Sequence, residues 1–142
     1  NLACQKPEEE GYITVEGMEH IRDRIRNLLE KAEERVYLSC SCSCLESMEE
    51  ELQKLVRAGR KMVLITDHPY DLKGALVYVT EDKGHQIGLI ADSRYVLTGE
   101  YGPGSMNTCL YSGQRNFVVL FKTALANEIE LIKIRKGEKE NE

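Results

Sequence analysis

A strand, a helix and a second strand follow one another between residues 36 and 66, and this pattern constrains the fold more than any other part of the sequence. Residues 36–40 and 61–66 are apolar runs, too short for helices and of the right length for buried strands. The segment between them repeats apolar side chains at helical spacing: Leu45, Met48, Leu52, Leu55 and Val56. Strand, helix and strand within about 30 residues form a βαβ unit, which predicts two parallel strands joined by a right-handed crossover.

Three helices are expected in all. Residues 16–34 carry apolar side chains on one face and charged ones on the other, which predicts an amphipathic helix before the first strand. The start of the middle helix is indicated twice, by Ser43 with Glu46 and by Ser47 with Glu50, both at capping-box spacing. Asn116 is a suitable N-cap for the last helix, whose apolar side is expected to hold Phe117, Leu120, Phe121, Ala124, Leu125 and Ile132.

The segments that follow residue 66 indicate antiparallel strands. Residues 75–80, 86–91 and 95–98 are short strand-like runs separated by tight polar turns, and residues 99–113 form a Gly-rich loop. We therefore predict an α/β fold whose mixed sheet, a parallel βαβ core plus antiparallel strands, is flanked by helices. The expected domain spans residues 12–136, between a flexible linker at 1–11 and a disordered tail at 137–142.

Composition limits the setting in which the chain works. Its 142 residues suffice for one core, and 24 acidic against 19 basic residues argue against sequence-independent binding of nucleic acid by this domain. No apolar run approaches the roughly 20 residues that span a bilayer, and no leader opens the chain. Five cysteines, three of them within residues 40–44, make a poor disulfide framework, so we expect a reducing cytoplasm. Because Asn1 is not an initiator Met, we also expect a fragment of a longer protein.

One motif combines a histidine with an aspartate. His85 and Asp92 are separated as in the HxKxxxxD signature of the phospholipase D superfamily, which they resemble, and Gly104-Ser105-Met106-Asn107 resembles the Gly-Ser-x-Asn that follows it. In active members of that family the His is the nucleophile, the Asp orients it and the Lys offsets phosphate charge, and the resemblance implies these roles for the matching positions. Here Ile87 stands at the Lys position, so phosphodiester hydrolysis is not expected. The second half lies five residues later than usual, through an inserted loop or by a chance match.

A wider resemblance runs through most of the chain. Four segments resemble the TrmB-like transcriptional regulators in their local sequence and in their order: residues 12–21, 32–39, 52–66 and 90–100. In those regulators a winged helix-turn-helix precedes a catalytically inactive phospholipase-D-like domain. The resemblance spans roughly residues 12–135. It implies a regulatory domain that binds a small-molecule effector, uses no cofactor, forms a homodimer and contacts DNA only through an N-terminal winged helix-turn-helix.

This chain departs from that family's pattern in two ways. It contains no helix-turn-helix, as expected of a regulatory fragment. It also ends soon after the last predicted helix, whereas sugar-binding members continue into a C-terminal segment that helps to form the sugar site. The resemblance therefore does not imply a sugar ligand here.

The carboxyl ends of the two parallel strands are the expected place for a ligand, as in other open α/β sheets. The predicted ligand-binding residues are those that follow these strands, together with those of the broken motif: Cys40, Cys42, Asp67, His68, His85, Asp92, Ser105 and Asn107. For the two aspartates and His85, an ordinary role in a turn is the alternative.

Two other functions stay open. The chain could be a divergent phospholipase-D-type hydrolase or nuclease that takes its cation from Lys83 or Lys73. It could also be a metal or thiol sensor, because alternate cysteines at 40, 42 and 44 would share one side of an extended chain, with His68 nearby. Zinc sites usually space their cysteines more widely, so buried small side chains are the favoured interpretation and no metal is expected. Residues 22–26, which mix Arg with Asp, are expected to be a solvated helix face.

Overall fold

The computed structural model describes residues 11–140, so the predicted linker, except Gly11, and residues 141–142 of the predicted tail lie outside it. Within that range seven strands form one sheet in the order β1-β7-β6-β5-β2-β3-β4. The strands are β1 Tyr12–Glu16, β2 Arg35–Ser39, β3 Lys61–Thr66, β4 Leu76–Val79, β5 Gln86–Ala91, β6 Tyr95–Glu100 and β7 Thr108–Ser112. The helices are α1 Met18–Lys31, α2 Cys42–Ser47, α3 Glu49–Arg57 and α4 Arg115–Glu140.

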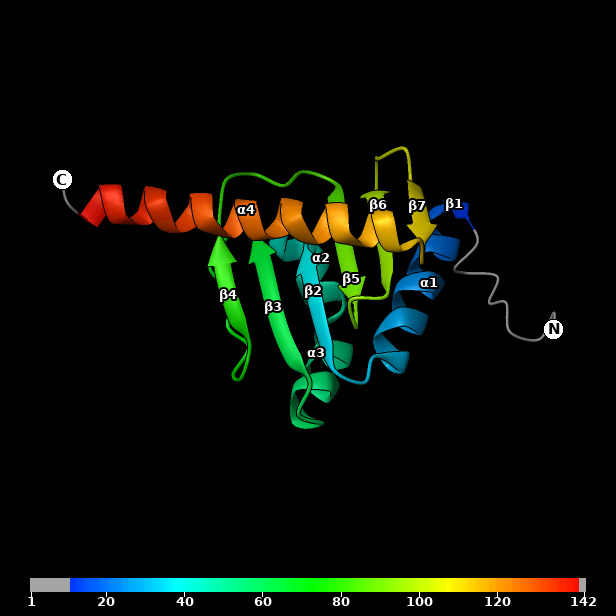
Figure 1. The fold of residues 1–142 in the computed structure, drawn as a ribbon, viewed down its shortest axis with the longest axis horizontal. Helices are drawn as coiled ribbons and strands as arrows, with labels where there is room; N and C mark the ends of the chain where they lie inside the picture. The colour runs from blue at the N-terminus through cyan, green and yellow to red at the C-terminus, as the bar shows by residue number, and fades with distance from the viewer. Residues whose placement is uncertain (1–10, 141–142) are drawn as a thin grey trace.

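Helices cover both faces of the sheet (Figure 1). α1, α2 and α3 lie on one face over the larger core cluster, to which they contribute Ile21, Ile25, Leu29, Leu45 and Leu52. α4 crosses the other face over a smaller cluster, formed by Ile65, Ile90, Val96, Val118 and Leu125. Side chains along β5 alternate between the two faces of the sheet, so this strand contributes to both clusters: Ile87 and Leu89 belong to the larger cluster and Ile90 to the smaller one. No helix within residues 11–140 has the length and apolar composition needed to cross a membrane.

The predicted mixed sheet is confirmed. β2 and β3 are parallel, with Val36 opposite Met62, and they flank the helical crossover. β5, β6 and β7 add to the sheet in antiparallel pairs, beginning with β5 against β2. The expectation for residues 75–80 was wrong in direction, because β4 pairs with β3 in parallel. The connection at residues 67–75 carries the chain back along the sheet before β4 begins, which a propensity pattern does not reveal.

Two strands were not predicted. β1 lies directly ahead of the predicted helix at residues 16–34, where no strand was expected, and β7 falls inside the predicted Gly-rich loop. They pair with each other, Tyr12 opposite Ser112, across most of the chain. β7 also packs closely on β6, where a Cβ at Gly99 would collide with the Thr108 carbonyl oxygen. Such pairing depends on partners distant in sequence, so the local pattern carried little signal.

The helix predicted after β2 is divided in two. Met48, with φ −114° and ψ 9°, separates α2 from α3. The N-cap of α2 is Ser41, whose Oγ accepts a hydrogen bond from the Cys44 amide at 3.2 Å, so the predicted caps at Ser43 and Ser47 were wrong. Cys42 and Cys44 therefore lie on a helix, and the extended-chain argument for a three-cysteine cluster does not apply.

The last helix differs from its prediction at both ends. α4 already includes Arg115, so Asn116 lies inside the first turn, and the helix runs to Glu140, beyond the expected boundary at residue 136. Val118 is buried against the sheet, whereas Leu120, which was assigned to the apolar side, is 64% exposed. Residues 117–121 are all apolar, so the sequence alone did not determine which of them face the sheet.

Candidate functional site

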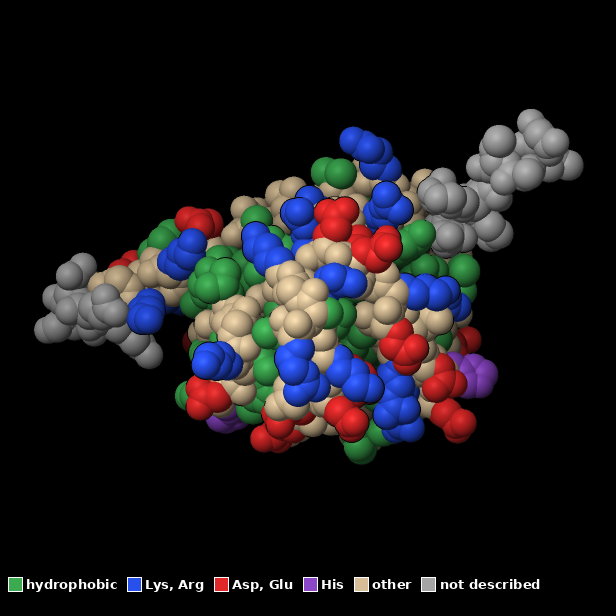
Figure 2. All heavy atoms as spheres, turned by 90° about the horizontal axis from the view of Figure 1, so that it is seen from below, with side chains coloured by type: hydrophobic (Ala, Val, Ile, Leu, Met, Phe, Trp, Pro, Cys, Tyr) green, Lys and Arg blue, Asp and Glu red, His purple; other side chains and the backbone are tan. Residues whose placement is uncertain are grey.

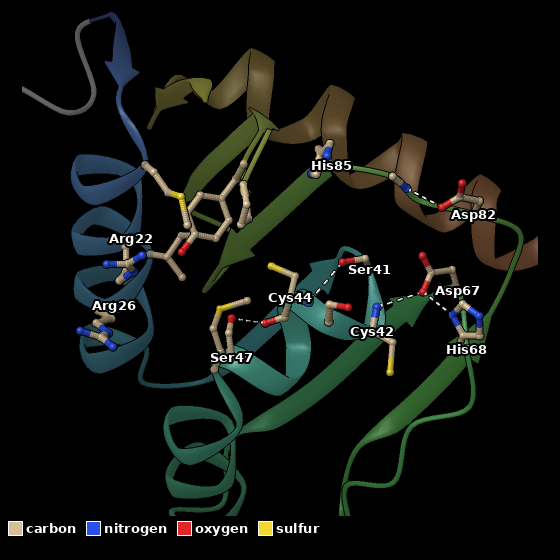
Figure 3. Close-up of a pocket in the computed structure, with 18 residues that line it drawn as sticks. Arg22, Arg26, Ser41, Cys42, Cys44, Ser47, Asp67, His68, Asp82 and His85 are labelled. Carbon is tan, nitrogen blue, oxygen red and sulfur yellow. Dashed lines mark hydrogen bonds and ion pairs between the residues drawn. The ribbon is translucent and has the colours of Figure 1, made fainter. Parts of the chain in front are cut away.

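A cavity of about 660 Å³ lies at the carboxyl ends of β2 and β3, where the sheet topology predicted a site (Figure 3). This volume is in the range of small-molecule sites. α1 forms one wall, α2 and the residues after β3 form the floor and the opposite wall, and the β6–β7 loop closes the rim. The lining residues used below are Arg22, Arg26, Ser41, Cys42, Asp67, His68, Asp82, His85, Tyr101 and Gly102.

Asp67 holds the floor of the cavity together. Its Oδ1 accepts a hydrogen bond from the Cys42 amide at 2.9 Å and lies 3.0 Å from Nδ1 of His68, and its Oδ2 accepts from the Lys83 amide at 3.1 Å. Burial acts to raise the pKa of Asp67, but the hydrogen bonds from Cys42, His68 and Lys83 outweigh it and lower the pKa below its usual value. The residue therefore ties α2 to the β4–β5 connection as a carboxylate.

The α1 wall is cationic. Arg26 donates from Nε to Oε2 of Glu51 on α3 at 3.0 Å, so its charge is already balanced. Arg22, one turn earlier, has no salt bridge to any residue within 11–140; its neighbour across the cavity is Tyr101. A hydrogen bond with the Tyr101 side chain raises the pKa of Arg22. Arg22 is thus a cation at the cavity surface that a ligand can reach.

His85 enters from the rim. The Tyr101 amide donates to the His85 carbonyl oxygen at 2.9 Å, and a Cβ at Gly102 would lie 3.1 Å from Nδ1 of His85, so a glycine suits this close approach. Asn107 fixes the loop by accepting from the Gly102 amide at 2.9 Å and donating to the Gly102 carbonyl at 3.0 Å. Ser105 accepts from the Asn107 amide at 3.1 Å. Ser105 and Asn107 therefore shape the rim and do not line the cavity.

Asp92 is at the other end of β5 from His85, about 20 Å away along an extended strand. It lies with Ser93 in the three-residue turn between the paired residues Ala91 and Tyr95, and both Asp92 and Ser93 have positive φ, 54° and 55°. Its carboxylate accepts hydrogen bonds from the amides of Glu33, Glu34 and Arg35 at 2.8 to 3.0 Å. Burial raises its pKa, but these three bonds outweigh that effect and lower it. Asp92 anchors the α1–β2 connection, and the structure does not bring it to the cavity.

Three residues were considered for the lysine of the HxKxxxxD signature, and the structure places each of them away from the cavity lining. Ile87 stands at its position on the same face of β5 as His85, and it is only 2% exposed within the larger core cluster. Lys83 forms an ion pair with Glu128 of α4 on the opposite face of the sheet. Lys73 is exposed on the connection between β3 and β4 and is not among the lining residues.

Two thiols near the cavity, those of Cys40 and Cys42, have raised pKa values. A hydrogen bond with Cys44 and burial both raise the pKa of Cys40 well above its usual value, and burial raises that of Cys42. Cys40 is buried beneath the floor. Among residues 11–140 no group of three or more His, Cys, Asp and Glu side chains is arranged to hold a metal ion.

The structure brings together half of the predicted site. Cys42, Asp67, His68 and His85 line the cavity, whereas Cys40, Asp92, Ser105 and Asn107 do not. Sequence reasoning missed Asp82, Tyr101 and the pair Arg22 and Arg26, which had been assigned to a solvated face. The pair carried a usable signal, since it is spaced i, i+4 and each arginine directly follows a core residue, Ile21 or Ile25.

A model of the family described as "Transcriptional regulator TrmB, EBD N-terminal subdomain" matches residues 11–112. No curated protein matches the chain. Among solved structures, TrmBL2, described as an archaeal chromatin protein with a novel mode of DNA binding, is 18% identical with a TM-score of 0.67; the match covers 91% of this chain and 56% of that one. The chain thus spans little more than half of TrmBL2.

Two further solved structures share the fold. NucT from Helicobacter pylori is 14% identical with a TM-score of 0.66, over 84% of this chain and 96% of its own. Nuc from Salmonella typhimurium, a phospholipase D family member, is 10% identical with a TM-score of 0.66, over 82% and 92%. The fold is therefore phospholipase-D-like.

Proposed function

Because the chain belongs to the TrmB family of transcriptional regulators, where it matches the N-terminal subdomain of the EBD, we propose that it binds a small-molecule effector and catalyses no reaction. The observation that carries the proposal is the cavity at the ends of β2 and β3, which keeps His85 at its rim but has Ile87 in place of the motif's lysine. A regulatory domain needs a ligand site and has no need of a catalytic cation.

The side chains around His85 support the absence of hydrolysis. Attack on a phosphodiester builds negative charge that a nearby cation must offset. Ile87 cannot supply that charge, and the charge of Lys83 is neutralised by Glu128 on the far side of the sheet. The remaining cavity cation, Arg22, comes from α1 and is not part of the motif.

The charges in the cavity favour an anionic effector. The carboxylate of Asp67 is occupied by three hydrogen-bonding partners, Asp82 accepts a hydrogen bond from the Gly84 amide at 2.8 Å, and Arg26 is balanced by Glu51. Arg22 with the Tyr101 hydroxyl remains as a pair of donors for a carboxylate or phosphate, which guanidinium groups bind well. Met18, Ile25 and Met48 add apolar lining. The effector class is thus a small polar metabolite with at least one acidic group.

The connection to DNA is proposed to run through the N-terminal side. α1 carries Arg22, and β1 immediately precedes it, so a shift of α1 on ligand binding would reach a winged helix-turn-helix placed ahead of β1. We expect the complete regulator to work in the cytoplasm as a homodimer, which suits a palindromic operator.

Effector binding is tested by calorimetry with citrate, glucose 6-phosphate and uncharged glucose as probes. We expect at least one of the two anions to bind more tightly than glucose, and Arg22→Met to weaken its binding about tenfold or more, because a hydrogen bond to a charged group contributes about 1.5–3 kcal/mol. Arg57→Met is the matched control, since Arg57 is exposed on α3 outside the cavity. Equal loss in both variants, or a preference for glucose, would contradict the proposal.

Hydrolysis is tested separately with bis(p-nitrophenyl) phosphate. We expect no release of nitrophenol above the buffer rate from either the wild-type chain or the His85→Ala variant. Release that depends on His85 would establish the alternative of a divergent phospholipase-D-type hydrolase.

A further inference from the structure

α4 carries a second apolar face that the sheet does not cover. Its inner face packs through Val118 and Leu125. A stripe on its outer side repeats at intervals of four and three residues and consists of Leu120, Ala124, Asn127, Leu131 and Ile134, all exposed. Leu120, Leu131 and Ile134 are 64%, 45% and 56% exposed. At 3.6 residues per turn the stripe is roughly 150° around the helix from the face formed by Val118 and Leu125. We call these five residues the outer stripe.

The spacing of the outer stripe is that of a coiled-coil seam. Apolar residues that repeat every 3.5 residues form the line along which two helices pack side by side. In this repeat Leu131 stands at an a position and Ile134 at a d position, and Asn127 is a polar d position in the middle of the stripe. A seam of this kind is complementary to an identical seam, and identical partners give the closed two-fold contact found in most dimers.

Charges beside the stripe fit a parallel pair. Glu130 precedes Leu131 and Arg135 follows Ile134, so they flank the seam on opposite sides, five residues apart. In parallel coiled coils residues five apart on two helices face each other across the seam. Glu130 of each helix would thus meet Arg135 of the partner helix. In the single chain Glu130 forms a salt bridge with the exposed Lys133, at 3.4 Å.

The surroundings leave room for a second helix. The C-terminal part of α4 projects beyond β4, the edge strand of the sheet (Figure 1). Seen from below, this projecting end shows hydrophobic side chains next to charged ones (Figure 2). A partner helix on the outer stripe would approach from the side away from the sheet.

We propose that a second copy of this chain covers the outer stripe, with the two α4 helices parallel and related by a two-fold axis. The proposal names the surface of the homodimer that the proposed function invokes, but it rests on α4 alone. An effector that fails to bind leaves the dimer unchanged, and a monomeric chain can still bind the effector, so the two proposals fail separately.

The oligomeric state is measured by sedimentation equilibrium over a concentration series. We expect the wild-type chain to form dimers and Leu131→Glu/Ile134→Glu to raise the dissociation constant about a hundredfold or more, because each buried charge removes the contribution of a central anchor. Met106→Glu is the control, since Met106 is equally apolar and 79% exposed but lies on the β6–β7 loop. A monomeric wild-type chain, or equal weakening in the control, overturns the proposal.

The parallel register has its own test. Glu130→Arg and Arg135→Glu should each weaken the dimer about tenfold, and the two together should restore it, because the pair is then reversed on both sides. Asn127→Cys should form a disulfide between the two copies under mild oxidation. A dimer that forms no such crosslink, and in which the double charge reversal does not restore affinity, overturns the parallel arrangement.

Discussion

At the scale of single residues, the two aspartates of the predicted site have the same structural role in different parts of the fold. Asp67 and Asp92 each accept backbone hydrogen bonds that join segments distant in sequence, and each has a lowered pKa as a result. The motif spacing from His85 to Asp92 is preserved, yet it places the two residues at opposite ends of one strand. The spacing of two residues along one strand therefore does not show whether their side chains lie in the same site.

Replacing Asp92 should cost stability and change the acid response. Asp92→Ala leaves the amides of Glu33, Glu34 and Arg35 without their acceptor, and we expect a loss of about 1–3 kcal/mol in the free energy of unfolding. Because the folded pKa of Asp92 is lowered, its contribution is present above the unfolded pKa of about 3.9 and is lost as the pH falls through the folded value.

Urea unfolding between pH 7 and pH 2 measures this effect. The wild-type chain should lose stability more steeply than Asp92→Ala below about pH 4, where the carboxylate is protonated. Asp71→Ala is the control, because Asp71 is an exposed residue of the β3–β4 connection, and its effect should remain within about 0.5 kcal/mol. Parallel pH curves for wild type and Asp92→Ala would contradict the assignment.

At the scale of elements, the position of α4 on the sheet depends on a glycine in β5, Gly88, which has no side chain. Gly88, in the middle of β5, faces the ring of Phe121, and a Cβ there would lie 2.7 Å from Cζ and 2.9 Å from Cε2 of that ring. The glycine therefore lets the helix sit close to the strand. The same strand presents Ile87 on its other face, so β5 serves both helical layers.

Gly88→Ala should displace α4 through Phe121. We expect a loss of about 1–3 kcal/mol, the usual cost of inserting a methyl group into a packed contact. In combination with Phe121→Ala the cost should fall well below the sum of the two single losses, because the smaller side chain removes the collision. Chemical denaturation of the four chains gives the coupling energy, and simple additivity would show that Gly88 does not set this contact.

Local sequence patterns predicted some of the strands and missed others. β3 and β5 begin and end where the apolar runs predicted, because buried strands bounded by polar turns have sharp edges. β1 and β7 were missed because their stability comes from each other, about 100 residues apart. Arg22 was missed for a related reason, since whether an arginine beside a core residue faces solvent or a cavity depends on loops that pack opposite it.

At the scale of the whole molecule, charge is distributed without a dominant sign. Lys and Arg alternate with Asp and Glu over the face seen from below (Figure 2), in keeping with a formal charge of -5. Phosphate backbones attract surfaces with a clear cationic excess. The two features on which the proposals rest, a cavity on the side of α1 and α2 and an apolar stripe on α4, lie on opposite faces of one sheet.

β1 has a mechanical consequence for any polypeptide joined ahead of residue 11. Antiparallel hydrogen bonds run across the strand, so a pull along β1 loads its whole ladder to β7 in shear and does not open it bond by bond. The next residue, Gly17, is tied by its amide to the Asn107 carbonyl at 2.9 Å, and Asn107 braces Gly102 at the cavity rim. These contacts connect the N-terminal side both to α1, which holds Arg22, and to the loop that holds Tyr101.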